Sequence, residues 1–305
     1  SIKKAARKGV VEELNKRVSE IVKNPEIIFD NSGKFIWKGN PIAKTKKGHN
    51  YLSPEIEIIA DESLETESKV KLEDFLKKWF LGYLNDILGD LINLTKQKIQ
   101  NQYLRALVFQ LYEKNGVIKR AEIDNIVKLI PQNERKKLWG MGIKIGRYHV
   151  YLPKMLKPKA VEFRVSLWKI YHSQDNGEKI PKSGLNFINN KNYEKKFLLL
   201  CGFENFKEFF IRIDILEKLF IKILNNTKDR KFKINAEMMN LLGCTKDNFY
   251  KLMSLMNYKK DRDKDTYIFK GEKKKISKII KFDKKENPFK KLLSLNLDPM
   301  LKKPV

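Results

Sequence analysis

The segment RYHVYLPKMLKPKAVEFRVSLWKIYH, residues 147–172, carries the features from which a fold can be inferred. Its start, HVYL, has the composition of a short strand, and an amphipathic helix follows Pro153 and Pro158. We expect the two prolines to fix a rigid crossing between strand and helix. Six apolar residues of the segment are predicted to lie in a core: Val150, Leu152, Val161, Val165, Leu167 and Trp168.

The same segment is strongly basic. Its basic residues are spaced through the turn and along one helix face, where a strip could follow a nucleic-acid backbone. The alternative is an ordinary solvated helix face. The candidate binding residues here are Arg147, Lys154, Lys157, Lys159 and Arg164.

The composition of the chain favours a polyanionic partner. Of 305 residues, 64 are basic and 37 acidic, so the formal net charge is 64 − 37 = +27. Such a field attracts nucleic acid first and a membrane surface second. The alternative is that part of the lysine excess reflects the codon usage of an AT-rich genome. A hydrophobic fraction of 42% is enough to form real cores.

Several kinds of chemistry find no support in the sequence. Cys201 and Cys244 are far apart and have no ligand-spaced neighbour, which predicts free thiols and no metal site. The three histidines are scattered, and no hydrolase or nuclease motif occurs. No apolar run approaches the roughly 18 residues of a membrane span. We therefore expect a cytoplasmic protein without membrane contact and without a cofactor of its own.

Periodicity predicts a mainly α fold with small β elements. A basic helix is expected at 1–24, a small β unit at 25–66 and a helical bundle at 67–172. The β unit contains a hairpin with the turn DNSG and a third strand, EIEII, and its lysines are expected on loops. The bundle includes an aromatic stripe, Phe75, Trp79, Phe80 and Tyr83, that is predicted to be core.

The remaining chain is divided into a polar linker at 173–192, a winged-helix domain at 193–270 and a basic tail at 271–305. The order within 212–270 is helix, strand, helix, tight turn, helix and a two-stranded wing, which is typical of a winged helix. Asn235 and Thr245 are expected to cap its second and third helices.

In that geometry the helix at 245–256 is the recognition helix. Its exposed donors suit phosphates and base edges. The candidates on the helix and on the wing are Lys246, Asn248, Tyr250, Lys251, Lys259, Lys260 and Arg262. The alternative is a winged helix that serves as a protein-protein or intramolecular module, and the acidic residues at the wing tip, Asp261, Asp263 and Asp265, weaken the case for nucleic-acid contact there.

Several segments carry a resemblance to one protein family. GIKIGRYHVYLPKMLKPKAVEFRVSLWKIYH (142–172), GKFIWKGNPIAK (33–44), MMNLLGCTKDNFYKLMSLMNYK (238–259) and NPFKKLLSLNL (287–297) resemble the region after the motor in bacterial superfamily 2 helicases related to the mitochondrial RNA degradosome helicase. The resemblance implies an accessory region that grips the nucleic acid leaving an ATP-dependent motor. It also implies RNA rather than DNA as the substrate, and the motor domains, with their ATP and Mg²⁺, as partners in cis.

The motifs of the motor itself are missing from the chain. The nearest candidate for a phosphate loop, GNPIAKT (39–45), has Ala43 where glycine should precede the lysine, and no DExH or DExD box occurs. We therefore expect no ATP hydrolysis by this chain alone. Because the chain begins at Ser1, it is expected to be either a processed product or part of a longer protein. The alternative function is a free-standing winged-helix protein, such as a replication initiator or a regulator.

Overall fold

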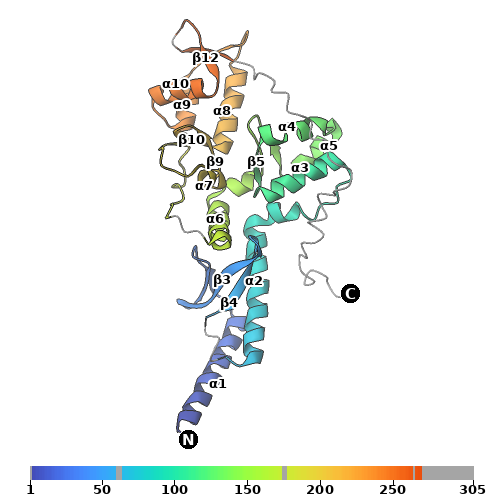
Figure 1. Ribbon diagram of the computed structural model, residues 1–305, viewed down its shortest axis with the longest axis vertical. Helices are drawn as coiled ribbons and strands as arrows, with labels where there is room; N and C mark the ends of the chain where they lie inside the picture. The colour runs from blue at the N-terminus through green and yellow to red at the C-terminus, as the bar shows by residue number, and fades with distance from the viewer. Residues whose placement is uncertain (1, 60–63, 174–176, 264, 270–305) are drawn as a thin grey trace. The chain divides into compact units, whose positions relative to one another are not determined.

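The computed structural model describes residues 2–59, 64–173, 177–263 and 265–269 (Figure 1). The fold is mixed α+β, with about half of the described residues in helices and with small antiparallel sheets. The chain divides into two compact units. The first contains the described residues of Ser1–Asp90, Lys154–Leu185 and Asn190–Asn205, and the second contains those of Leu91–Pro153, Asn186–Asn189 and Phe206–Val305.

The first unit begins with helix α1 (Ile2–Lys23) and a four-stranded antiparallel sheet in the order β1-β2-β3-β4. The strands are β1 Ile27–Phe29, β2 Lys34–Trp37, β3 Asn40–Asn50 and β4 Ser53–Ile58. Strands β1 and β2 pair in antiparallel register on either side of the predicted turn. In this turn, the Asp30 carboxylate accepts the backbone N–H groups of Ser32 at 2.9 Å and Lys34 at 2.8 Å.

Strand β3 continues without a break through both Pro41 and Gly48, residue types that often interrupt a strand. The register shifts beside Pro41, between Phe35 and Ile36, where a bulge accommodates the imino acid. The lysines expected on loops lie mostly in strands: Lys34 in β2, and Lys44, Lys46 and Lys47 in β3.

The aromatic stripe lies on α2 (Thr66–Asn93) and packs into the core, but its partners differ in part from those predicted. Phe80 lies 5.4 Å from Phe29 of β1 and 6.0 Å from Phe163, measured between ring centroids. Trp79 lies 5.9 Å from Phe35 of β2. The stripe therefore packs against the sheet, which was not predicted, and against α6 (Pro158–His172), which belongs to the predicted bundle.

The strand, proline and helix order predicted for residues 147–172 is confirmed. Strand β7 (His149–Tyr151) is followed by a 3-10 helix, Pro153–Leu156, and by α6. Pro158 lies in the first turn of α6, where its missing N–H removes no helical hydrogen bond. Trp168 is half-buried, and the other five predicted core residues are buried.

The second unit contains two segments with the same order of elements, helix, strand, helix, helix, strand and strand. Module A, residues 102–151, consists of α3 Gln102–Glu113, β5 Val117–Lys119, α4 Arg120–Leu129, α5 Gln132–Gly140, β6 Lys144–Ile145 and β7. Its sheet has the order β5-β7-β6. The sequence had been assigned to a helical bundle, and α5 and the two strands β5 and β6 were not foreseen. Strands of two or three residues are too short to show an alternating pattern.

Module B, residues 213–269, consists of α8 Ile213–Asn225, β11 Lys231–Lys233, α9 Ala236–Leu242, α10 Lys246–Leu255, β12 Tyr258–Lys260 and β13 Thr266–Phe269. These elements follow the predicted order, and the sheet has the order β11-β13-β12. Both predicted caps are present. The Asn235 side chain accepts the Met238 N–H at 3.0 Å, and the Thr245 hydroxyl accepts the Asn248 N–H at 3.3 Å.

The segment predicted as a linker contains a strand. Strand β8 (Phe187–Asn189) pairs in antiparallel register with β10 (Phe209–Arg212). Between them the chain forms α7 (Lys195–Leu200) and β9 (Phe203–Phe206). The predicted basic tail, 271–305, lies outside the described residues.

Candidate nucleic-acid interface

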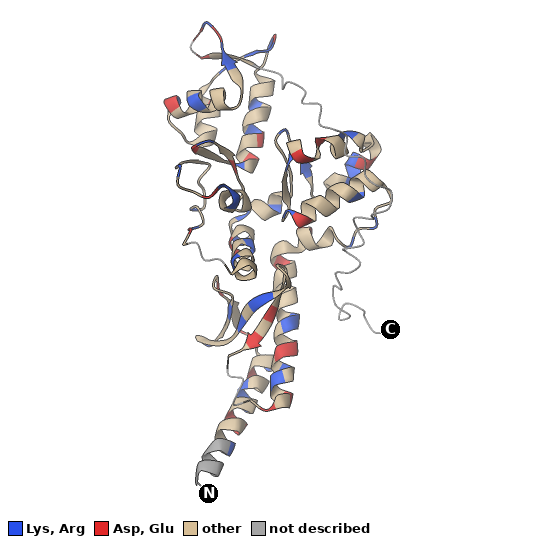
Figure 2. Ribbon diagram, in the orientation of Figure 1, with Lys and Arg blue, Asp and Glu red and all other residues tan. Residues whose placement is uncertain are grey.

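Lys and Arg are distributed over both units (Figure 2), so the charge alone does not mark a site. One of the five residues of the basic strip predicted within 147–172 is not accessible to a ligand. Arg164 is 1% exposed, and its guanidinium donates to the backbone carbonyls of Met155 at 2.6 Å and Leu200 at 3.2 Å. Burial also lowers the pKa of Arg164. The prediction that Arg164 contacts nucleic acid is therefore wrong, because the side chain fastens the 3-10 helix to the end of α7.

The other members of the strip are divided between the two units. Lys154, Lys157 and Lys159 are exposed in the first unit, and Lys154 forms an ion pair with Asp90 at 2.9 Å. Arg147 belongs to the second unit, where its guanidinium carbon lies 5.7 Å from the centroid of the Phe220 ring. These four residues remain candidates, but no single helix face presents them.

Of the candidates on α10, Lys246 and Lys251 are exposed, Asn248 and Tyr250 are half-buried, and three of the four have partners in the second unit. Lys246 lies 3.8 Å from Asp265, and Tyr250 donates its hydroxyl to the same carboxylate. The hydrogen bond of Lys246 with Tyr250 and, to a smaller extent, the charge of Asp265 raise the pKa of Lys246, so its ammonium group keeps its charge. Lys251 forms an ion pair with Glu208. Helix α10 thus presents donors whose charge is partly balanced by its own unit.

The antiparallel pair β12 and β13, which was predicted to be a wing, presents three exposed basic residues, Lys259, Lys260 and Arg262. The Lys260 ammonium lies 5.7 Å from the centroid of the Tyr250 ring, so the wing lies beside α10. Cations on a projecting hairpin beside a helix are positioned to contact phosphates that flank a groove.

The acidic residues at the wing tip are held by the same module. Lys231 of β11 pairs with Asp261 at 2.8 Å, and this contact lowers the pKa of Asp261. Asp263 accepts the Thr266 hydroxyl at 3.1 Å. Since Asp265 is used by α10, all three acids have internal partners, and their presence at the tip no longer weakens the case for nucleic-acid contact.

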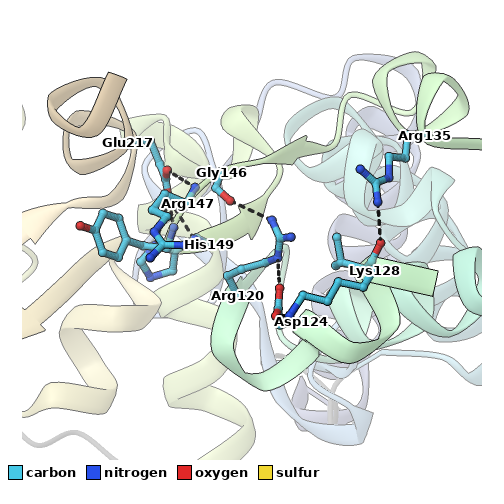
Figure 3. Close-up of polar contacts among 10 residues, drawn as sticks. Arg120, Asp124, Lys128, Arg135, Gly146, Arg147, His149 and Glu217 are labelled. Carbon is cyan, nitrogen blue, oxygen red and sulfur yellow. Dashed lines mark hydrogen bonds and ion pairs between the residues drawn. The ribbon is translucent and has the colours of Figure 1, made fainter. Parts of the chain in front are cut away.

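A buried carboxylate joins module B to module A (Figure 3). Glu217, on α8, accepts the backbone N–H groups of Arg147 at 2.6 Å, Tyr148 at 2.9 Å and His149 at 2.9 Å. The His149 side chain is fully buried, with its Nδ1 atom 3.6 Å from Glu217 Oε1. Three charge-assisted hydrogen bonds to consecutive backbone groups fix the turn between β6 and β7 against α8.

Gly146 and Arg120 complete this joint (Figure 3). A Cβ atom on Gly146 would lie 2.2 Å from the Glu217 carboxyl carbon, so only glycine lets the carboxylate approach. Arg120 donates to the Gly146 carbonyl at 3.1 Å and pairs with Asp124 at 3.1 Å. The glycine at position 146 therefore has a structural explanation in the joint.

Sequence reasoning missed two features of this unit. Glu217 was not singled out, although an acid four residues after the buried Ile213 is a recognisable signal on an amphipathic helix. Helix α5 was not recognised, and it carries Trp139, whose exposed fraction is 81%. A search for an internal repeat would have found α5, as shown below.

Other chemistry is limited in the described part of the chain. No group of three or more His, Cys, Asp or Glu residues there is arranged to hold a metal ion. Burial raises the pKa of Cys201 to about 12 and that of Cys244 to about 11, so both thiols are poor nucleophiles at neutral pH. Among the described helices, none combines the length and apolar composition that a bilayer crossing requires.

Comparisons of the chain with protein-family models, with curated proteins and with solved structures gave no match in any of the three cases.

Proposed function

We propose that the chain binds duplex DNA through a winged-helix domain formed by module B. The observation that supports this function most strongly is the placement of basic side chains on two adjacent elements. Helix α10 is the third helix of the module, and β12 and β13 form a hairpin beside it. In a winged helix these are the two elements that contact a duplex, with the third helix in the major groove and the wing on the flanking backbone.

Groove geometry favours DNA over RNA for such a module. The major groove of B-form DNA is wide enough to admit an α-helix. The corresponding groove of A-form RNA is deep and narrow, and side chains do not read it. A protein that reads through a projecting helix is therefore better suited to duplex DNA, whereas the family resemblance led us to expect RNA.

The role as the post-motor region of a superfamily 2 helicase stays a prediction. Two glycines that carry the resemblance have local explanations. Gly142 adopts a left-handed conformation, with φ +75°, directly after the end of α5, and Gly146 allows the approach of Glu217. Pro158 begins α6. Residues required by the local fold do not by themselves indicate attachment to a motor.

The test is a titration of three labelled probes with the full chain, in which fluorescence anisotropy measures the binding. The probes are a duplex DNA of about 24 base pairs, a duplex RNA of the same sequence and the corresponding single-stranded RNA. We expect duplex DNA to bind most tightly, with an affinity that falls steeply with salt concentration. Tighter binding of single-stranded RNA would contradict the proposal and favour the helicase prediction.

A wing variant tests the assignment to module B. Replacing Lys259, Lys260 and Arg262 together by alanine should weaken duplex binding and reduce the slope of log affinity against log salt by about 3. The matched control replaces three exposed lysines of α1 and α2 in the first unit, Lys16, Lys71 and Lys78, and so removes the same charge. Equal losses in both variants would show a nonspecific charge effect and would refute the assignment.

A further inference from the structure

Module A repeats the architecture of module B element by element. Both consist of helix, strand, helix, helix, strand and strand, and in both the last strand lies between the other two. Strand β7 pairs in antiparallel register with β5 and β6, and β13 does the same with β11 and β12. One sequence of elements and one sheet order, present twice in the same compact unit, indicate two copies of one fold.

The sequences agree at a constant separation of 236 − 121 = 115 positions. Without a gap, AEIDNIVKLIPQNERKKLWGMGIK (121–144) aligns with AEMMNLLGCTKDNFYKLMSLMNYK (236–259). The identical pairs are Ala121 and Ala236, Glu122 and Glu237, Asn125 and Asn240, Asn133 and Asn248, Lys136 and Lys251, Met141 and Met256, and Lys144 and Lys259.

The backbone supports this alignment independently. Met141 and Met256 are the C-terminal caps of α5 and α10, and each is followed by a residue with positive φ, Gly142 at +75° and Asn257 at +67°. Of the three buried residues of α10, Met253 aligns with the buried Leu138, whereas Phe249 and Leu252 align with Glu134 and Lys137, which are not buried. Helix α5 is therefore the counterpart of α10, the helix proposed to contact DNA.

One face of α5 is open and carries groups suited to a duplex. Asn133, Lys136 and Trp139 recur every three residues, so they lie along one side of the helix, and all three are exposed. An amide can bond to an adenine edge, an ammonium to phosphate or guanine, and an indole can pack on a sugar or a base. An exposed fraction of 81% is unusual for tryptophan in a folded protein.

The neighbouring basic side chains hold α5 in place and leave this face free. The Arg135 guanidinium donates to the backbone carbonyls of Val127, in α4, and of Ile130, both at 3.2 Å. Lys137 pairs with Glu134 at 2.8 Å. Binding a duplex on the open face would therefore not require these contacts to break.

We infer that module A is a second winged-helix module and that its α5 face, defined by Asn133, Lys136 and Trp139, is a second contact surface for the same DNA duplex. This inference rests on the proposed function of module B. The two modules differ in their wings, because the turn of module A is fixed by Glu217 of module B. The joint connects the two modules within one compact unit. A chain that contacts one duplex with both surfaces should require a longer duplex than one module does.

The test compares the affinity of the full chain for duplex DNA of about 24 and about 12 base pairs, which is roughly two turns and one turn of B-DNA. The α5 variant combines Asn133→Ala, Lys136→Ala and Trp139→Ala. The control is Lys78→Ala, which removes one charge from an exposed position of α2. Because the three α5 positions are exposed, the variant should keep the circular dichroism spectrum and melting temperature of the native chain.

We expect the α5 variant to lose about tenfold or more in affinity for the long duplex, and Lys78→Ala to lose little. A variant that combines Asn133→Ala and Lys136→Ala with Trp139→Phe keeps an aromatic ring. It should bind the long duplex more tightly than the α5 variant does. Unchanged binding by the α5 variant, together with a loss in the wing variant, would overturn the inference and leave the proposed function standing. Unchanged binding by both variants would overturn the two proposals together.

Discussion

Modules A and B share one architecture but use their last two strands differently. In module B, β12 and the connection to β13 carry the exposed cations Lys259, Lys260 and Arg262, and the acids of the connection are held within the module. In module A the equivalent turn between β6 and β7 is short and is held by Glu217 of α8. The comparison shows that one structural position can serve as a candidate ligand contact in one copy and as an internal joint in the other, depending on which charge lies opposite it.

The largest expected effect comes from removing the carboxylate of the joint. Glu217→Ala leaves three backbone N–H groups without their acceptor, and we expect a loss of about 3 kcal/mol in the free energy of unfolding, measured by urea denaturation. Glu237→Ala is the matched control, because Glu237 is exposed and pairs only with Lys222 among the contacts described for it. It should change the stability little. Equal losses of unfolding free energy in the two variants would show that the joint does not stabilise the fold. Glu217→Gln keeps one acceptor oxygen, so its loss should be smaller than that of Glu217→Ala and larger than that of Glu237→Ala.

A smaller effect is expected from the glycine that faces this carboxylate. Gly146→Ala would place a methyl group 2.2 Å from the Glu217 carboxyl carbon, and we expect a loss of about 2 kcal/mol. Gly140→Ala, in α5, meets no atom within 4 Å and should cost nothing. In the double variant Gly146→Ala with Glu217→Ala, the loss in the free energy of unfolding should be smaller than the sum of the losses in the two single variants, because the clash disappears with the carboxylate. Full additivity would contradict the proposed contact.

The smallest effect concerns the residues that follow the aligned helices α5 and α10. Gly142 and Asn257 both have positive φ, a conformation that glycine and asparagine tolerate better than other residues. We expect Gly142→Ala to lower the free energy of unfolding by about 1 kcal/mol and Asn257→Gly to lower it not at all. A loss in Asn257→Gly similar to that in Gly142→Ala would mean that the two positions are not equivalent, and would weaken the alignment of the modules.

Much of the fold could be predicted from local patterns. Helix periodicity, the hairpin turn at Asp30 and the caps at Asn235 and Thr245 depend on residues within a few positions of each other. The same holds for the order of elements in module B. Strands β5 and β6 of module A escaped prediction because they are only three and two residues long. The repeat was present in the sequence. It was missed because the apolar pattern of residues 67–172 was interpreted as one helical bundle.

The candidate site was predicted less completely, for a physical reason. Whether a charged side chain is available to a ligand depends on what lies opposite it, and that partner is often far away in the chain. Arg164 lies on the same helix as the exposed Lys159, yet it is buried, and one of the two carbonyls that accept its guanidinium belongs to Leu200, 36 positions later. Lys251 has its charge balanced by Glu208, and Asp261 is held by Lys231, 30 positions earlier.

The sequence by itself determined the net charge, the helices, the caps and the basic wing, because these follow from composition and from interactions between near neighbours. Only the tertiary structure decided which basic residues are buried, that Glu217 binds a turn some 70 positions earlier in the chain, and that the α5 face is open. A buried polar group is stable only when distant segments supply its hydrogen-bond partners. Periodicity along the chain carries no information about those partners.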